Sequence, residues 1–302
     1  MPGPSQFAAH RVIGTRRPTH GAARVVPERA HRVAADAIIP GTMIRSITHR
    51  PDTGASVALL IVLAVACLPQ AGGTSLTGPL PPGGHRVLFI GNSLTYVNDL
   101  PRTLSDLAAS VGDTIKTASV AFPDYALVDH ASEGSAARAI SLGGWEFVLL
   151  QQGPSSVGVN RDTLIAASRY FNDLIRAKGG RPALYSVWPQ IQFFSSFQRA
   201  IESYQMAAQA VNGLMLPGAS AWLAAWAADS TLELYSGDGL HPSPMGTYLA
   251  ALVMYEKFTD HDARPLPPTM VVEGSTYGTS AATVRLLQDA AHKANADFPL
   301  IR

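Results

Sequence analysis

The chain carries little charge, and this excludes one class of protein. Only 15% of its 302 residues are Asp, Glu, Lys or Arg, whereas about 25% is usual for a globular domain. Hydrophobic residues make up 47%, whereas a disordered chain has low hydrophobicity and high net charge. The length and composition therefore predict a folded protein with one large domain or two small ones.

Cysteine is almost absent, because Cys67 is the only one in the chain. A single thiol excludes a disulfide framework and a zinc site built from cysteines alone. The histidines form no H-E-x-x-H motif and no close pair after residue 84, and no glycine-rich phosphate loop follows a predicted strand. We therefore expect neither a metal ion nor another cofactor.

Positive charge is concentrated at the start of the chain. Residues 1–50 hold eight arginines and two acidic residues, a net charge of +6, so the other 252 residues carry −5. Such a head is either a nucleic-acid arm or a targeting segment. An uncharged apolar run follows at residues 55–68 and stops at Pro69. It is shorter than the roughly 18 residues of a membrane-spanning helix, so the pattern predicts a secretory signal and no nucleic-acid partner.

The signal pattern also predicts how the chain is divided. Residues 43–67 form a signal peptide of ordinary length, and residues 1–42 are interpreted as a gene-model extension or a disordered head. Residues 68–84 are a linker rich in glycine and proline. Residues 85–302 then form one folded domain, which we expect to be a monomer.

Cys67 closes the apolar run, directly after Leu63-Ala64-Val65-Ala66. This stretch resembles a bacterial lipobox, in which the cysteine is lipidated and becomes the mature N-terminus. Plain secretion, with Cys67 discarded, and an uncleaved anchor are the alternatives. We expect an exported protein, either secreted or attached to the cell envelope by a lipid on Cys67. One acyl chain alone anchors a protein only weakly.

After the linker, short apolar runs alternate with amphipathic segments. Strands are predicted at 85–90, 114–120, 145–150, 182–187 and 214–216. Helices are predicted at 100–111, 131–142, 162–177, 197–211, 245–258 and 281–296. This alternation indicates an α/β domain with a parallel sheet covered by helices on both faces. Active sites of such sheets lie at the carboxyl ends of the strands.

Two short motifs point to nucleophilic catalysis. In Gly91-Asn92-Ser93-Leu94-Thr95, Ser93 follows the first strand and can present its Oγ at the sheet edge. Asp238 and His241 lie three residues apart, so the carboxylate can accept a hydrogen bond from Nδ1 and leave Nε2 to take a proton from a serine. Either motif alone is common in turns and helix caps. Together they favour a Ser-His-Asp triad, although G-x-S-x-G is absent and the α/β-hydrolase elbow is excluded.

These motifs resemble the first and last blocks of the SGNH (GDSL-like) hydrolases, in the same order and roughly 150 residues apart. The resemblance covers about residues 85–260. It implies a flavodoxin-like three-layer α/β/α sandwich and hydrolysis of an acyl ester through an acyl-enzyme. Ser93 would then be the nucleophile, His241 the general base and acid, and Asp238 the carboxylate that orients the histidine.

The middle blocks depart from the family pattern, which bears on the oxyanion hole. Pro123 has no N–H to donate, so Asp124, which tolerates a left-handed backbone, is expected to donate its N–H together with that of Ser93. The family's Gly-x-Asn-Asp block, whose Asn amide donates, is replaced by Gln151-Gln152-Gly153-Pro154-Ser155. The resemblance favours Gln152 as the substitute and leaves Gln151 and Ser155 open.

The remaining expectations concern the substrate. Trp188 follows the fourth strand and either lines the acyl or sugar side of the pocket or lies in the core. We expect a small-molecule or glycan ester with a short acyl group, such as acetyl. The alternatives are a glycan O-acyltransferase with the same site and a non-catalytic binding lipoprotein that keeps the fold.

Overall fold

The computed structural model describes residues 82–299. The predicted signal peptide, the lipidation site at Cys67 and the head before Met43 lie outside the described residues and stay predictions. Within residues 82–299, every helix is too short or too polar to span a bilayer.

Five parallel strands form the central sheet, in the order β2-β1-β3-β4-β5. They are β1 (His85–Gly91), β2 (Ile115–Ala121), β3 (Phe147–Leu150), β4 (Arg181–Tyr185) and β5 (Leu214–Leu216). This is the flavodoxin-like order, in which the topological switch point lies between β1 and β3. All five strands agree with the apolar runs that predicted them. The buried parts of β1 and β3 are apolar because both faces of the sheet are covered there, whereas the edge strand β2 carries polar residues and is only partly buried.

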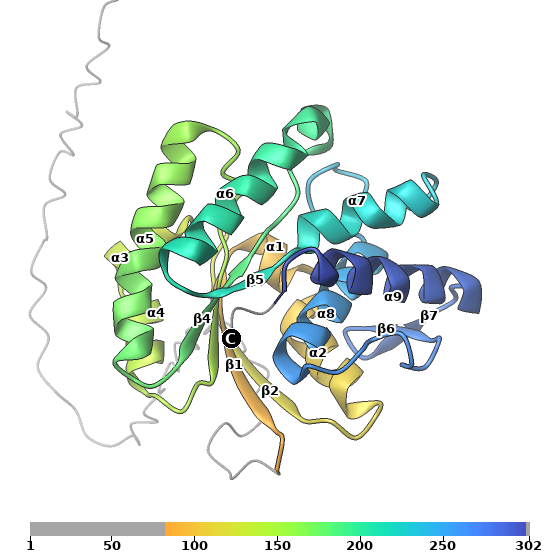
Figure 1. Cartoon of the computed structure of the whole chain (residues 1–302), viewed down its shortest axis with the longest axis horizontal. Coiled ribbons are helices and arrows are strands. Elements are labelled where there is room, and N and C mark those ends of the chain that lie inside the picture. Colours follow the sequence, from red (N-terminus) through yellow and green to blue (C-terminus); the bar gives the residue numbers. More distant parts are fainter. Residues whose placement is uncertain (1–81, 300–302) are drawn as a thin grey trace, which may run out of the picture. The chain divides into compact units, whose positions relative to one another are not determined.

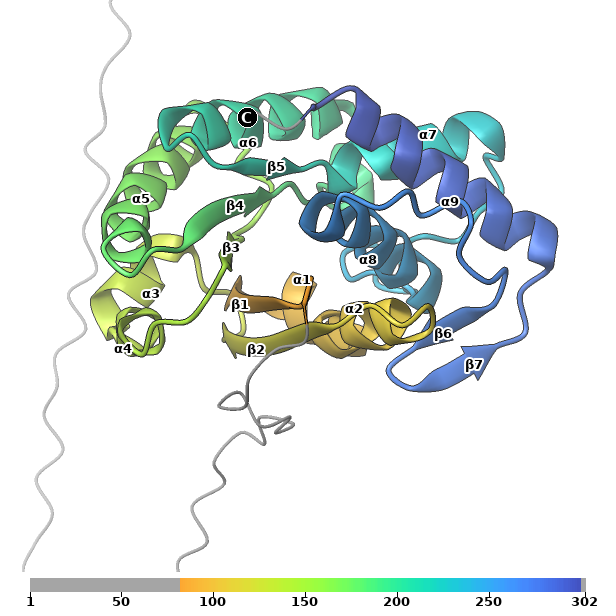
Figure 2. The same ribbon diagram turned by 60° about the horizontal axis from the view of Figure 1, so that its bottom comes forward.

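Helices cover the sheet on both faces (Figures 1 and 2). One face carries α1 (Ser93–Tyr96), α2 (Leu100–Ala109) and α8 (Pro244–Thr259), with α7 (Gly218–Ala228) and α9 (Ala281–Ala296) packed against α8. The other face carries α3 (Leu127–Glu133), α4 (Ser135–Ser141), α5 (Gly158–Arg176) and α6 (Phe197–Ala210). The three-layer α/β/α sandwich predicted from the sequence is therefore confirmed.

Helix α8 packs against α2, α7 and α9 on the first of these faces and is buried from Gly246 to Phe258. Its N-cap, Ser243, accepts a hydrogen bond from the Gly246 N–H at 3.1 Å. A Cβ at Gly246 would collide with the Leu234 carbonyl oxygen and the Trp222 ring, so only glycine fits here. This tight packing fixes the start of α8, and with it the loop that carries His241.

Helices α1 and α7 lie outside the predicted helix ranges, and two further parts of the fold differ from the prediction. The helix expected at 131–142 is two helices, α3 and α4, because Gly134 between them has a φ of +88° and cannot continue a helix. The antiparallel hairpin of β6 (Met270–Val272) and β7 (Ser275–Tyr277) had no predicted counterpart. Its strands are only three residues long, too short to produce an alternating pattern.

Candidate active site

Ser93 is the first residue of α1 and follows β1 at the carboxyl edge of the sheet. The preceding residue, Asn92, caps the helix: its Oδ1 accepts from the Leu94 N–H at 3.1 Å, and its Nδ2 donates to the Tyr125 carbonyl at 3.0 Å. Within residues 82–299, neither the N–H nor the Oγ of Ser93 has a hydrogen-bond partner. Both groups are therefore available to a ligand.

Gln151, which follows β3, holds this turn through hydrogen bonds to Asn92 and Thr95. Its Oε1 accepts from the Asn92 N–H at 2.9 Å and from the Thr95 hydroxyl at 2.8 Å. Its Nε2 donates to Asn92 Oδ1 at 2.9 Å and to the Gln152 carbonyl at 2.7 Å. The side chain is fully buried, and every donor and acceptor it carries is used. Gln151 therefore orients the Ser93 turn and has no N–H left for an oxyanion.

The backbone of the turn passes very close to these side chains. A Cβ at Gly91 would collide with Gln151 Oε1 and Thr95 Oγ1, which explains the glycine at this position. The Gly91 carbonyl accepts a hydrogen bond from Nε2 of His130, at 2.8 Å. His130 is fully buried inside α3, and burial lowers its pKa. It is therefore a neutral residue that supports the turn.

Asp238 and His241 form a hydrogen-bonded pair in the loop before α8. His241 Nδ1 donates to Asp238 Oδ2 at 2.6 Å. The other carboxylate oxygen accepts from Ser236 Oγ at 2.7 Å and from the N–H groups of Leu240 and His241 at 2.9 Å. The hydrogen bond from His241 is the main reason that the pKa of Asp238 lies well below its usual range. Because Nδ1 donates, Nε2 of the neutral imidazole is free to accept a proton.

One side chain, that of Asn98, ties this loop to the segment that follows α1. Asn98, in a turn that follows α1, donates from Nδ2 to the Pro242 carbonyl at 3.0 Å and to Thr247 Oγ1 at 2.9 Å. Its φ of +56° is a left-handed conformation that asparagine tolerates. Leu240 lines the same cavity as Ser93. The structure thus brings the two predicted motifs to one edge of the sheet, although no hydrogen bond among the described residues joins Ser93 Oγ to His241.

The cavity beside Ser93 has a volume of about 750 Å³, within the range of small-molecule sites. Its lining combines serines and amides with aliphatic and aromatic side chains. Asp124 is at the rim with a φ of +59°, as its tolerance of a left-handed backbone allows. Its N–H has no partner within the described residues. The structure therefore places the Ser93 and Asp124 N–H groups, both unpaired, at the same cavity.

The structure separates the three candidates for the side-chain donor. Gln152 lines the cavity, and its Nε2 donates to Ser155 Oγ at 2.8 Å and to the Asn160 carbonyl at 3.4 Å. The second contact is at the limit of a hydrogen bond, so one amide hydrogen can be redirected to a ligand. Ser155 also lines the cavity, but its hydroxyl donates to the Gly153 carbonyl at 3.0 Å. Of the three, Gln152 is the best placed, whereas both amide hydrogens of Gln151 are already donated.

Trp188 lies in the core, one of the two positions that the sequence left open for it, and it does not line the pocket. Its side chain is fully buried and stacks on Trp222, with ring centroids 3.5 Å apart. Its indole N–H donates to the Leu240 carbonyl at 3.0 Å. Trp188 therefore supports the Asp238–His241 loop from beneath.

Two further residues of the site were not identified from the sequence. Tyr204 of α6 donates its hydroxyl to the Gln152 carbonyl at 2.6 Å and accepts from the Gln152 N–H at 3.0 Å, which fixes the loop after β3. Ser236 binds Asp238, as described above. Tyr204 belongs to no recognisable motif, because it acts through a contact 52 residues away in the chain. Ser236 lies two residues before Asp238 in the same loop, but its role depends on the geometry of that loop.

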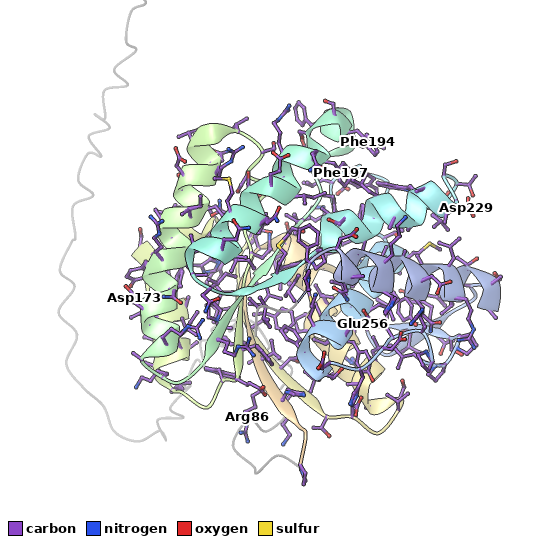
Figure 3. The ribbon with its side chains drawn as sticks, in the orientation of Figure 1. Arg86, Asp173, Phe194, Phe197, Asp229 and Glu256 are labelled. Atoms are coloured by element: carbon purple, nitrogen blue, oxygen red, sulfur yellow. The ribbon has the colours of Figure 1, made fainter. Side chains whose placement is uncertain are left out.

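One group of side chains in the described residues has the composition of a metal site. Ligand atoms of Glu256, Asp262 and His292 lie within 4.8 Å of one another; Glu256 is labelled on α8 in Figure 3. His292 Nδ1 already binds Glu256 Oε1 at 3.1 Å, and the Arg264 guanidinium binds Asp262 at 2.6 Å. An ion-pair network accounts for this group, and none of its members lines the cavity that contains Ser93.

No protein-family model and no curated protein sequence matches the chain. A DUF4886 family protein from Bacteroides uniformis has a similar structure, with a TM-score of 0.60 and 18% identity over 70% of this chain and 94% of that one. A proposed SGNH hydrolase from Slackia heliotrinireducens gives a TM-score of 0.49 and 26% identity over 57% and 98% of the two chains. An acetylxylan esterase from Geobacillus stearothermophilus gives 0.42 and 14% over 59% and 93%.

The similarity to the Bacteroides uniformis structure supports the three-layer architecture, in addition to the strand order. At 18% identity, this similarity is evidence for the fold alone. The described part of the chain therefore has the α/β fold that the resemblance to the SGNH hydrolases implies.

Proposed function

We propose that the protein is a serine ester hydrolase of the SGNH type. The observation that carries the proposal is the cavity at the carboxyl edge of the sheet. Ser93 lines it with an unpaired Oγ and an unpaired N–H, and the loop that holds the Asp238–His241 pair borders it through Leu240. A nucleophile, a base and a group that orients the base are the three parts that acyl transfer requires.

In the proposed first step, His241 Nε2 takes the Ser93 hydroxyl proton as Oγ attacks the ester carbonyl. The carbonyl π electrons move to oxygen, which becomes the oxyanion of a tetrahedral intermediate. Collapse of this intermediate breaks the bond to the alcohol, which leaves with the proton from His241. Water then attacks the acyl-enzyme by the same route and restores Ser93. Asp238 stays ionised throughout and stabilises the imidazolium that forms in each step.

The oxyanion would be held by the N–H groups of Ser93 and Asp124 and by Nε2 of Gln152. Loss of a single donor of this kind costs about 3–4 kcal/mol in other hydrolases, so each should be visible in the rate. The carboxylate of Asp124 must point away from the oxyanion, because a negative charge beside it would raise the barrier. Asp124 supports this role because it lines the cavity and its N–H has no partner within the described residues.

Short acyl esters, acetyl esters in particular, are the proposed substrates, and esters of carbohydrates are included among them. The cavity volume of about 750 Å³ accommodates a sugar-sized alcohol. The export signal predicted at residues 43–67 would bring the enzyme to glycans outside the cytoplasm.

Hydrolysis of p-nitrophenyl acetate tests the proposal. We expect measurable turnover by the wild type and a loss of at least about a thousandfold in Ser93→Ala. Ser132→Ala is the matched control, because Ser132 is an exposed serine on α3 that does not line the cavity. Equal rates for the wild type and Ser93→Ala would overturn the assignment.

A further inference from the structure

Arg199 is one of two charged side chains that line the cavity among the described residues; the other is Asp124. Arg199 lies in the first turn of α6 and is exposed. Within residues 82–299, its guanidinium makes no ion pair and no hydrogen bond. Its five donors are therefore open to an anion in the cavity.

The fold gives no reason of its own for a cation at this position. Glu202, one turn later on α6, accepts a hydrogen bond from Gln198 at 3.3 Å instead of pairing with Arg199. A cation in the first turn of a helix also opposes the helix dipole. Arg161 adds further positive charge nearby, since its Nε donates at 3.1 Å to the hydroxyl of Ser203, which itself donates to the Arg199 carbonyl. Arg161 itself does not line the cavity, so Arg199 is the one unpaired cation there among the described residues.

An aromatic ring is exposed at the same cavity. Phe193 lines it and is 58% exposed. The next residue, Phe194, packs on Phe197 with ring centroids 4.9 Å apart, and Figure 3 shows these two rings together near the start of α6. Phe193 thus remains available as an apolar surface for a ring-shaped ligand.

We propose that the substrate is an ester whose alcohol portion carries a carboxylate or a phosphate, and that Arg199 binds this anion. The inference rests on the proposed function, because it identifies the leaving group of the same reaction. Guanidinium groups match both anions with two parallel hydrogen bonds. Asp124, the other charged residue of the cavity, repels the anion, so the charged end of the substrate would lie toward Arg199 on α6 and the acyl group toward Ser93. A sugar acid or sugar phosphate would also place a ring against Phe193.

Equilibrium binding of three sugars, measured by calorimetry, tests the proposal without relying on catalysis. The probes are glucuronic acid, glucose 6-phosphate and neutral glucose, each titrated into the wild type, Arg199→Gln and Arg169→Gln. Arg169 is an exposed arginine of α5 that does not line the cavity, so its variant controls for net charge. We expect at least one anionic sugar to bind about tenfold or more tightly than glucose. The ratio of the glucose Kd to the Kd of the anionic sugar should fall to near one in Arg199→Gln and stay unchanged in Arg169→Gln.

The better-bound anion identifies the source of the charge, carboxylate or phosphate. The proposal is overturned when neither anion binds more tightly than glucose, or when the preference survives in Arg199→Gln. Failure of the proposed function is a separate result. It would appear as an absence of p-nitrophenyl acetate hydrolysis by the wild type, a substrate whose alcohol portion carries no anion.

Discussion

Replacement of Gln151 by methionine tests how the Ser93 turn is held. Methionine fills a similar volume but cannot hydrogen bond as the amide does. Two groups would then lose their sole partner among the described residues: the Asn92 N–H and the Thr95 hydroxyl. Asn92 Oδ1 would keep the Leu94 N–H, and the Gln152 carbonyl would keep the Tyr204 hydroxyl.

The expected cost follows from these two orphaned groups. A buried polar group without a partner costs about 1–3 kcal/mol, so Gln151→Met should lower the free energy of unfolding by about 2–6 kcal/mol. This is a large part of the roughly 5–15 kcal/mol by which a domain is stable. A second substitution, Thr95→Val, should then change the free energy of unfolding in opposite directions in the wild type and in Gln151→Met. It removes a hydrogen bond from the wild type, at a cost of about 1 kcal/mol, but removes an orphaned hydroxyl from Gln151→Met and restores about 1–2 kcal/mol.

Urea unfolding followed by circular dichroism measures all four members of this cycle. The coupling between the two sites should be about 2–3 kcal/mol, well above the few tenths expected for independent sites. The role assigned to Gln151 would be refuted if Gln151→Met lowered the free energy of unfolding by less than about 1 kcal/mol. It would also be refuted if the effects of the two substitutions were additive.

Three other perturbations have definite expected outcomes. Asp238→Asn should lower kcat on p-nitrophenyl acetate by a factor on the order of 10⁴, because the imidazole loses the carboxylate that sets its tautomer; a change below tenfold would contradict the pairing with His241. His130→Gln should flatten the pH dependence of urea unfolding below about pH 6.5. Burial lowers the pKa of His130 in the folded protein, so below about pH 6.5 protons bind preferentially to the unfolded chain. The free energy of unfolding of the wild type therefore falls by up to about 1.4 kcal/mol for each pH unit of acidification. Identical slopes in the two proteins would count against this. Asn98→Gly, which keeps the left-handed backbone but removes the tie to Pro242, should lower kcat about 10–100-fold while folding is retained; unchanged kcat would show that the tie does not position the loop.

The central strands of the sheet were predictable because they are buried on both faces. The buried part of β1, Val87 to Ile90, has to be apolar, and this leaves a clear signal in the sequence. The Asp238–His241 pair was predictable for a different reason, since its partners are three residues apart and meet within one turn. Elements without such local signals, the β6–β7 hairpin among them, were missed.

The role of Gln151 could not be obtained from local sequence. Gln151 and Gln152 are neighbours at the end of β3, and successive side chains of a strand point to opposite faces. Which of them faces the cavity depends on the pairing of β3 with β1, where the Gln151 N–H donates to the Ile90 carbonyl at 2.9 Å. Trp188 presents the same difficulty, because its stacking partner Trp222 comes from α7 and only the assembled core shows that no room remains at the pocket.

Labelling with a fluorophosphonate, followed by peptide mass mapping, tests the central claim most directly. The reagent reacts only with a serine that a neighbouring base activates, and it forms a stable adduct on the nucleophile. The account predicts one modified residue, Ser93, in the wild type, and the loss of labelling in Ser93→Ala and in His241→Ala. An unlabelled wild type, or a label on another serine, would contradict it.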